Sequence, residues 1–302
     1  MPFHYSKSIM EQGKQMNILV TGGAGFVGTN LIKRLLKDGH NVVSLDNYST
    51  GTEDNHQEGC EYFYTDIRDV VDFSYYMEKP DVVYHLAALA RIQPSFKNPA
   101  NTLEVGILGT MNLLEWVKEL ENKPRVIFAG SSSVHSGKFK NPYTFSKNVA
   151  DDMCLLYKKH FGVEVSICRF YNVYGPYQLT EGEYCTVVGI FERQYKNGEP
   201  LTITGDGFQR RDFTHIDDIV DGLILTSENE TCWDEIELGR GNNFSINELA
   251  DMFSWNIQYI DARPGEAKET LCNTLIAKRL IGYKPTRNIE DYIKEVIWNN
   301  KK

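Results

Sequence analysis

The chain has 302 residues, of which 41% are hydrophobic and 24% charged, as in an ordinary globular protein large enough for one big domain or two fused lobes. Its 32 basic and 41 acidic residues leave a net charge of −9, so the sequence offers no basic surface for nucleic acid or an anionic membrane. No apolar run approaches the roughly 20 residues of a membrane span and residues 1–15 lack the apolar stretch of a signal peptide, so we expect a cytoplasmic protein.

A glycine-rich turn follows the first apolar run and precedes a segment with helical periodicity. Residues 16–20 form the run and predict a strand, and the order of strand, turn and helix suits a dinucleotide diphosphate. We expect Gly22 to take the backbone angles of a tight turn, Gly25 to let the main chain approach the phosphates, and Gly28 to let the helix pack closely. The free N–H groups of the first helical turn would then face the anion.

A second apolar run, residues 42–45, ends at Asp46. A carboxylate at this position accepts hydrogen bonds from the adenosine ribose hydroxyls and repels a 2′-phosphate, so we expect NAD rather than NADP. The glycine spacing is G-x-x-G-x-x-G instead of G-x-G-x-x-G, and the alternative is a structural turn that binds nothing. The second strand and its terminal acid favour the cofactor site.

Farther along the chain, strand-length apolar runs alternate with helix-length amphipathic stretches. They cover residues 82–86, 101–121, 126–129, 143–160 and 165–170. This alternation predicts an α/β protein with a doubly wound parallel sheet, the Rossmann arrangement.

From Pro176 onward the alternation loosens, and turns rich in glycine, proline and asparagine become frequent, which predicts a smaller C-terminal α/β lobe that closes over the cofactor. We expect a tail at residues 1–15, a NAD-binding Rossmann domain at residues 16–175 and a substrate-binding lobe at residues 176–302. Parts of residues 209–240 are expected to return to the Rossmann domain.

Tyr143 and Lys147 are one turn apart on a predicted helix that Asn141 can cap and Pro142 can begin. A free phenol titrates near 10, so a tyrosine that acts as a base near neutrality must have its pKa lowered by about three units. We expect the ammonium group of Lys147 to lower it. Tyr143 and Lys147 are therefore the candidate catalytic pair.

The same spacing occurs at Tyr75 and Lys79, but Pro80 and a predicted strand follow that pair at once. This order places it at the amino ends of the strands, whereas ligands of open α/β sheets bind beyond the carboxyl ends. Tyr143 follows the strand at residues 126–129 by a short connection and lies on the productive side.

Three serines directly follow that strand, and one of their hydroxyls could share a hydrogen bond with the substrate oxygen that the phenolate attacks. The alternative is that the serines only cap and solvate the loop. The candidates are Ser131 and Ser132.

Together these motifs resemble the extended short-chain dehydrogenase/reductases, and within them the nucleotide-sugar epimerases and dehydratases, over residues 17–283. The resemblance implies that Lys147 also contacts the nicotinamide ribose. It implies a further set of cofactor contacts around the adenine and along the strand ends: Phe26, Val27, Asn47, Asp66, Ile67, Leu86, Ala87 and Ala88.

The resemblance also implies the substrate contacts. Asn172, within the run Arg-Phe-Tyr-Asn-Val-Tyr-Gly-Pro, corresponds to an asparagine that holds the sugar nucleotide, and Arg211 and Arg263 correspond to arginines that bind its diphosphate. Thr270 corresponds to the position that flanks the C2 substituent of the sugar. Because threonine is small, the resemblance implies that UDP-N-acetylhexosamines are accepted.

In the family, dehydratases carry an Asp-Glu pair beside the hydroxyl residue and decarboxylases carry a glutamate there. This chain has Ser132-Ser133-Val134, so dehydration is disfavoured and the sequence resembles the UDP-hexose 4-epimerases most. The implied reaction removes the 4-hydroxyl proton through Tyr143 and a hydride from C4, and returns the hydride to the other face of a transient 4-keto sugar. The alternatives are a nucleotide-sugar 4-reductase or another net oxidoreductase or dehydratase of the same family, and a NAD-sensing protein without chemistry.

The chain departs from the family pattern at three places. The connection from Ser133 to Tyr143 is much shorter than usual, His135-Ser136 replaces a tyrosine-glycine pair, and Gly106 replaces an asparagine that braces the lysine. Alignment from Val126 assigns the hydroxyl to Ser131, whereas anchoring on Gly137 assigns it to Ser132.

The resemblance implies a homodimer that pairs through the helices at residues 101–121 and 143–160. The six cysteines have no metal-ligand spacing, so we expect reduced thiols and no metal site.

Overall fold

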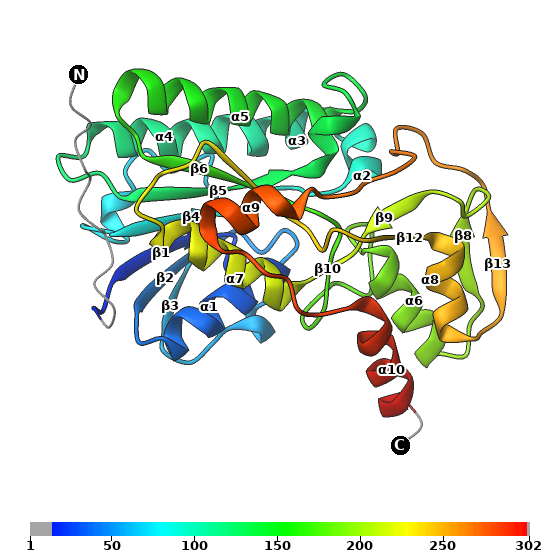
Figure 1. Ribbon diagram of the computed structural model, residues 1–302. Coiled ribbons are helices and arrows are strands. Elements are labelled where there is room, and N and C mark those ends of the chain that lie inside the picture. Colours follow the sequence, from blue (N-terminus) through cyan, green and yellow to red (C-terminus); the bar gives the residue numbers. More distant parts are fainter. Residues whose placement is uncertain (1–13, 301–302) are drawn as a thin grey trace.

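The computed structural model describes residues 14–300, so nearly all of the predicted tail lies outside the described residues. A seven-stranded parallel sheet forms the larger part of the fold, in the order β11-β6-β5-β4-β1-β2-β3 (Figure 1). The doubly wound sheet predicted from the alternation of strands and helices is confirmed. Its strands are β1 Asn17–Thr21, β2 Asn41–Asp46, β3 Cys60–Tyr64, β4 Val82–His85, β5 Arg125–Ser131, β6 Val165–Phe170 and β11 Glu235–Leu238.

Helices cover both faces of this sheet (Figure 1). Side chains of one face, such as Ile18 and Val20, pack with α1 (Phe26–Lys37), α7 (Ile216–Glu228) and α9 (Thr274–Ile281). The alternate side chains, such as Leu19, pack on the other face with α4 (Gly109–Glu119) and α5 (Pro142–Phe161). Two short helices, α2 (Ile92–Lys97) and α3 (Pro99–Leu103), and a π-helical segment (Glu104–Leu108) lead into α4. The helix predicted at residues 101–121 is thus present, and its hydrogen-bond pattern is π-helical near its start.

The remaining elements build a smaller α/β lobe with its own core, in which Phe191, Leu249 and Ile293 are buried. Its paired strands are β8 (Leu201–Thr204) with β13 (Ile257–Ile260), β9 (Arg210–Asp212) with β12 (Asn243–Ser245), and β7 (Val173–Tyr174) with β10 (Thr214–His215). Its helices are α6 (Val187–Lys196), α8 (Ile246–Phe253) and α10 (Ile289–Asn300).

Two segments beyond residue 176 pack with the large sheet. β11 adds the edge strand next to β6, with Ile236 opposite Cys168, and α7 packs on α1. α9 also packs against β11, which was not anticipated from the sequence. The domain division at residue 175 stays a prediction.

The carboxyl ends of β1, β2, β4, β5 and β6 meet at one edge of the sheet, where the connections to their helices begin. The strand order reverses direction at β1 and β4, which is the position where open α/β sheets bind their ligands. Among residues 14–300, no helix combines the length and the apolar character needed to cross a lipid bilayer.

Candidate active site

A cavity of about 480 Å³ opens at this edge of the sheet, lined by residues of both lobes. Of the site residues predicted from the sequence, all except Lys147 line it. These are Gly22, Gly25, Phe26, Val27, Gly28, Asp46, Asn47, Asp66, Ile67, Leu86, Ala87, Ala88, Ser131, Ser132, Tyr143, Asn172, Arg211, Arg263 and Thr270.

The three glycines of the turn differ in what a side chain would meet. Gly22 has φ +76°, and a Cβ on it would lie 2.8 Å from the backbone nitrogen of Ala87. A Cβ on Gly28 would lie 2.3 Å from the carbonyl oxygen of Gly22, whereas a Cβ on Gly25 would meet only that same oxygen, at 3.4 Å. The turn and packing expected of Gly22 and Gly28 are therefore present. Gly23, whose Cβ would lie 2.1 Å from the Oγ of Ser44, is a further position that needs glycine, and the spacing argument missed it.

The N-terminus of α1 fits an anionic diphosphate. Its N-cap residue, Gly25, provides no side-chain hydrogen bond to the first turn. Because a helix begins with unpaired N–H groups and a partial positive charge, this end is suited to phosphate oxygens.

Two carboxylates lie where the adenosine end of a dinucleotide is expected. Asp46 accepts hydrogen bonds from the backbone nitrogens of Ala24 (2.9 Å) and Tyr48 (2.8 Å); burial raises the pKa of Asp46, and these bonds oppose the rise. Asp66 accepts both arms of the Arg68 guanidinium, at 2.9 and 2.7 Å, which lowers its pKa to about 2. Both carboxylates can accept hydrogen bonds from the hydroxyls of a ribose or the amino group of an adenine. Arg68 was missed in the sequence.

The candidate catalytic pair, Tyr143 and Lys147, lies at the start of α5. As predicted, Asn141 caps this helix by accepting from the backbone nitrogen of Thr144 at 2.7 Å, and Pro142 is its first residue. Tyr143 lines the cavity, whereas Lys147 is buried and does not line it. The Lys147 ammonium donates to the carbonyl oxygen of Ala129 at 2.7 Å and lies 4.7 Å from the centre of the Phe128 ring.

The expected lowering of the Tyr143 pKa by Lys147 is wrong. Burial raises the pKa of Tyr143, and the groups that oppose this rise are the Ser131 hydroxyl, which hydrogen-bonds to the phenol, and the guanidinium of Arg91. Burial also lowers the pKa of Lys147 to about 8, because its charge lies in a poorly hydrated environment. The sequence spacing gave the position of both residues but not the direction of this pKa shift.

The two candidate serines have different surroundings. Ser131 ends β5 and is buried, and its hydroxyl bonds to Ser133 as well as to the Tyr143 phenol. Ser132 begins a 3₁₀ helix (Ser132–Ser136) and also lines the cavity. The bond to the phenol favours Ser131.

The second tyrosine-lysine pair lies at the opposite edge of the sheet, as its order in the chain predicted. Tyr75 ends a 3₁₀ helix and is 84% exposed, and the backbone of Lys79 bonds to Asn17 at the amino end of β1. This pair does not contribute to the cavity.

The predicted substrate residues come together from distant parts of the chain. The Asn172 side chain donates to the Thr270 hydroxyl at 2.9 Å. Arg211 is nearly buried, with burial lowering its pKa, and its guanidinium lies 3.4 Å from Glu266. Arg263 is exposed at the rim. The arrangement supplies two cations and one amide to an anionic sugar nucleotide.

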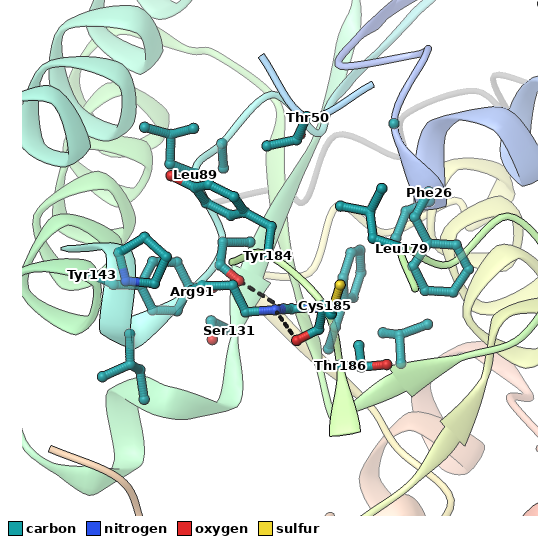
Figure 2. Close-up of a pocket in the computed structure, with 18 of the residues that line it drawn as sticks. Phe26, Thr50, Leu89, Arg91, Ser131, Tyr143, Leu179, Tyr184, Cys185 and Thr186 are labelled. Carbon is teal, nitrogen blue, oxygen red and sulfur yellow. Dashed lines mark hydrogen bonds between the residues drawn. The ribbon is translucent and has the colours of Figure 1, made fainter. Parts of the chain in front are cut away.

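Several cavity residues were missed in the sequence: Arg91, Tyr184 and Cys185 (Figure 2). Arg91 immediately precedes α2, and its guanidinium donates to the carbonyl oxygens of Ala90 (2.7 Å) and Cys185 (3.3 Å). Its place in the connection after β4, at the carboxyl edge of the sheet, is the signal that could have identified it.

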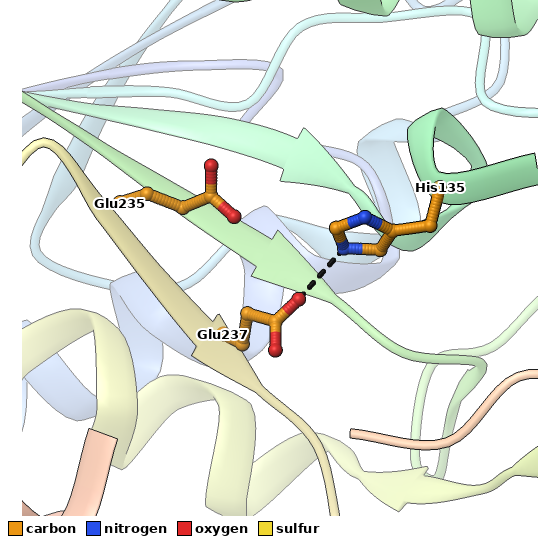
Figure 3. Close-up of side chains that lie close together, drawn as sticks. All are labelled: His135, Glu235 and Glu237. Atoms are coloured by element: carbon orange, nitrogen blue, oxygen red, sulfur yellow. Dashed lines mark hydrogen bonds and ion pairs between the residues drawn. The ribbon is translucent and has the colours of Figure 1, made fainter. Parts of the chain in front are cut away.

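A second polar cluster lies beside the shortened loop (Figure 3). His135, Glu235 and Glu237 bring their ligand atoms within 4.8 Å of one another, as a metal site would need. Each acid already has protein partners, however: Glu237 accepts from His135 (2.7 Å) and Tyr171 (2.8 Å), and Glu235 pairs with Arg169 at 2.6 Å. We therefore regard the cluster as an ion-pair network that ties the loop to β6 and β11.

Comparisons with known proteins agree with this geometry. A model of the NAD dependent epimerase/dehydratase family matches residues 18–239. The chain is 32% identical to a putative UDP-glucose 4-epimerase of Methanocaldococcus jannaschii, covering 93% of this chain and 97% of that protein. It is also 31% identical to UDP-glucuronic acid decarboxylase 1 of Xenopus tropicalis, over 95% of this chain and 73% of the relative. The crystal structure of UDP-glucuronic acid 4-epimerase from Bacillus cereus, with UDP-glucuronic acid and NAD, superposes with a TM-score of 0.86 at 30% identity and covers 95% of this chain and 99% of that one.

Proposed function

Because the chain belongs to the NAD dependent epimerase/dehydratase family and uses NAD, we propose that it is a 4-epimerase of UDP-hexoses. Its substrates would be UDP-glucose and UDP-galactose, and also their N-acetyl counterparts. The relatives include epimerases and decarboxylases, so the site itself must decide between these reactions.

The observation that carries the proposal is that every carboxylate lining the cavity in the described part of the chain already has a hydrogen-bond or ion-pair partner. Asp46 accepts from the glycine turn, Asp66 pairs with Arg68, Glu183 pairs with Lys97, and Glu266 pairs with Arg211. The positions after Ser131 are serines. Elimination of water needs an acid and a base at adjacent carbons, and among the described residues no free carboxylate lines the cavity to provide the second group. A proton transfer at one oxygen needs only Tyr143.

Several residues of the cavity fit NAD. The turn formed by Gly22, Gly25 and Gly28 and the N-terminus of α1 would hold its diphosphate, and Asp46 its adenosine ribose. The further cofactor contacts that the family resemblance implies line the same cavity: Phe26, Val27, Asn47, Asp66, Ile67, Leu86, Ala87 and Ala88. When bound, NAD would supply the acceptor for the hydride from C4 of the sugar and, in its reduced form, the donor that returns it.

The chain's own groups handle the proton. Tyr143 removes it from the 4-hydroxyl and returns it after the sugar has presented its other face, and Ser131 holds the reacting oxygen through a shared hydrogen bond. Lys147 donates to the carbonyl oxygen of Ala129, and the family resemblance implies that it contacts the nicotinamide ribose. Asn172, Arg211 and Arg263 would keep the nucleotide fixed while the sugar turns about its diphosphate linkage.

Proton NMR tests the proposal directly. Purified enzyme without added cofactor should convert UDP-glucose to UDP-galactose, and UDP-GlcNAc to UDP-GalNAc, up to an equilibrium mixture. A 4-keto-6-deoxy product would indicate a dehydratase. A change in NADH absorbance stoichiometric with substrate would indicate a 4-reductase, and no conversion by wild-type protein would favour a NAD-sensing role.

We also propose a homodimer. The outer faces of α4 and α5 expose apolar side chains, among them Met111 (39%), Leu155 (39%) and Leu156 (50%). Exposed apolar groups on two adjacent helices are suited to a four-helix contact with a second copy. Light scattering coupled to size-exclusion chromatography should give twice the mass of 34.6 kDa.

A further inference from the structure

Two arginines that line the cavity, the half-buried Arg91 and the exposed Arg263, have no acidic partner among residues 14–300. Arg68 pairs with Asp66, Arg169 with Asp151 and Arg211 with Glu266. Arg91 donates only to two neutral carbonyl oxygens, of Ala90 and Cys185. Among residues 14–300, the groups that raise the pKa of Arg91 are Tyr143 and Cys185, neither of which is a carboxylic acid, and burial outweighs them.

Arg91 is half-buried in the wall of the cavity, and a guanidinium that lines a cavity without an acidic partner is suited to bind an anion there. Arginine presents five N–H donors in a planar fork, and two carbonyl oxygens leave part of that fork for a ligand. The connection from β4 to α2 fixes the arginine, because Arg91 is held at the start of α2 and bonded across the cavity to the segment at Cys185 (Figure 2).

The position of this cation limits which anion it can meet. Arg91 and Tyr143 line the same part of the cavity, and the guanidinium acts electrostatically on the phenol. Under the proposed function, that phenol acts on the oxygen at C4 of the sugar. Arg91, beside that phenol, would therefore face the substituents on C3 and C5, the carbons adjacent to C4. The diphosphate is instead assigned to Arg211 and Arg263.

We propose that Arg91 is a specificity-determining residue that binds a carboxylate carried on a carbon adjacent to C4, so that acidic UDP-sugars are preferred over neutral ones. This inference rests on the proposed 4-epimerisation and narrows its substrate class. The room expected beside Thr270 for an N-acetyl group concerns C2 of the sugar, so it is independent of the inference about Arg91.

The test compares kcat/KM for UDP-glucuronate and UDP-glucose in wild-type enzyme, Arg91→Gln and Arg91→Lys. The ratio of the two values cancels any general effect of Arg91 on Tyr143. A fork bonded to a carboxylate predicts that Arg91→Gln lowers the acid-to-neutral ratio about 10- to 100-fold. Arg91→Lys keeps the charge but loses the planar set of N–H donors, so its acid-to-neutral ratio should lie between those of the wild type and Arg91→Gln. Arg279→Gln, at an exposed arginine on α9 outside the cavity, is the matched control and should leave the ratio unchanged.

Calorimetry with UDP-glucuronate, UDP-glucose and UDP separates the remaining outcomes. Arg91→Gln should weaken UDP-glucuronate binding by a similar factor and leave UDP binding unchanged.

Two results would overturn the inference. If Arg91→Gln weakened the binding of UDP as much as that of UDP-glucuronate, the anion would be the diphosphate. A wild-type enzyme that shows no preference for the acidic sugar would contradict it as well. UDP-N-acetylmuramate, with its carboxylate on an ether at C3, distinguishes the C3 side from the C5 side. If UDP-glucuronate binds through Arg91 but yields a UDP-pentose, the proposed epimerisation fails and the role of Arg91 stands.

Discussion

The glycine turn provides a sharp test of how the chain holds NAD, because Gly25 and Gly28 should fail for different reasons. A Cβ on Gly28 would lie 2.3 Å from the carbonyl oxygen of Gly22 and 2.6 Å from the Cα of Gly23. Both contacts are backbone, so Gly28→Ala must displace the turn. Overpacking costs about 1–3 kcal/mol, whereas replacing glycine by alanine within a helix gains at most about 1 kcal/mol. We expect a net loss of about 1–2 kcal/mol of stability.

Gly25→Ala is the matched variant. Gly25 has φ −82° and ψ 176°, which alanine adopts readily, and its Cβ would meet only the Gly22 oxygen, at the ordinary distance of 3.4 Å. Stability should change by less than about 0.5 kcal/mol. The added methyl would instead crowd a diphosphate at the helix N-terminus. Loss of one charge-assisted hydrogen bond, about 1.5–3 kcal/mol, predicts NAD binding weaker by about 10- to 100-fold.

Thermal unfolding and calorimetric titration of NAD into protein stripped of nucleotide separate the two effects. Gly28→Ala should lower the unfolding temperature without ligand, and Gly25→Ala should leave it near that of the wild type while losing NAD affinity. Equal unfolding temperatures for wild type and Gly28→Ala would refute the packing argument. Wild-type NAD affinity in Gly25→Ala would show that the diphosphate does not lie against this turn.

Three further predictions concern the catalytic residue, the sugar and the polar cluster. Tyr143→Phe should lower kcat at least 1,000-fold, an order-of-magnitude expectation for loss of the acid/base, while NAD affinity by calorimetry stays within a few fold; unchanged turnover would exclude Tyr143 as the base. Thr270→Tyr should lower kcat/KM for UDP-GlcNAc at least about 10-fold relative to UDP-glucose, whereas Thr270→Ser should not, and no turnover of UDP-GlcNAc by wild type would contradict the assignment. Glu237 raises the pKa of His135 above its ordinary 6.5, so their pair stabilises the fold below that pH and the contribution is lost as pH rises through the raised value. Because the His135 side chain is 51% exposed, urea unfolding of His135→Ala should show a loss of only about 0.5 kcal/mol at pH 5.5 that shrinks by pH 9, and a loss that grows with pH would contradict this sign.

The sequence predicted the large sheet well because its strands are buried on both faces and separated by amphipathic helices. β3 was not predicted: it is a half-exposed edge strand with Glu61 and Tyr64 facing outward, so it lacks a continuous apolar run. The packing of α9 on β11 was also missed, since no local pattern shows which lobe a C-terminal helix joins.

The site was predictable where a short motif fixes the backbone, as at Gly22, Gly28 and the capped start of α5. The properties of the site were not predictable where they depend on burial and on contacts between distant parts of the chain. Lys147 was expected to lower the pKa of Tyr143, but its ammonium bonds to Ala129 and burial of the phenol dominates. Arg91 belongs to no motif, and only the fold shows that it lines the same cavity as Tyr143.

The most direct test of the account uses UDP-glucose labelled with deuterium at C4, incubated with the enzyme in ordinary water without added NAD. If the hydrogen removed from C4 returns to the other face of the same carbon, NMR should show UDP-galactose that keeps the label at C4. Loss of the label to solvent, or accumulation of NADH with no UDP-galactose, would contradict 4-epimerisation.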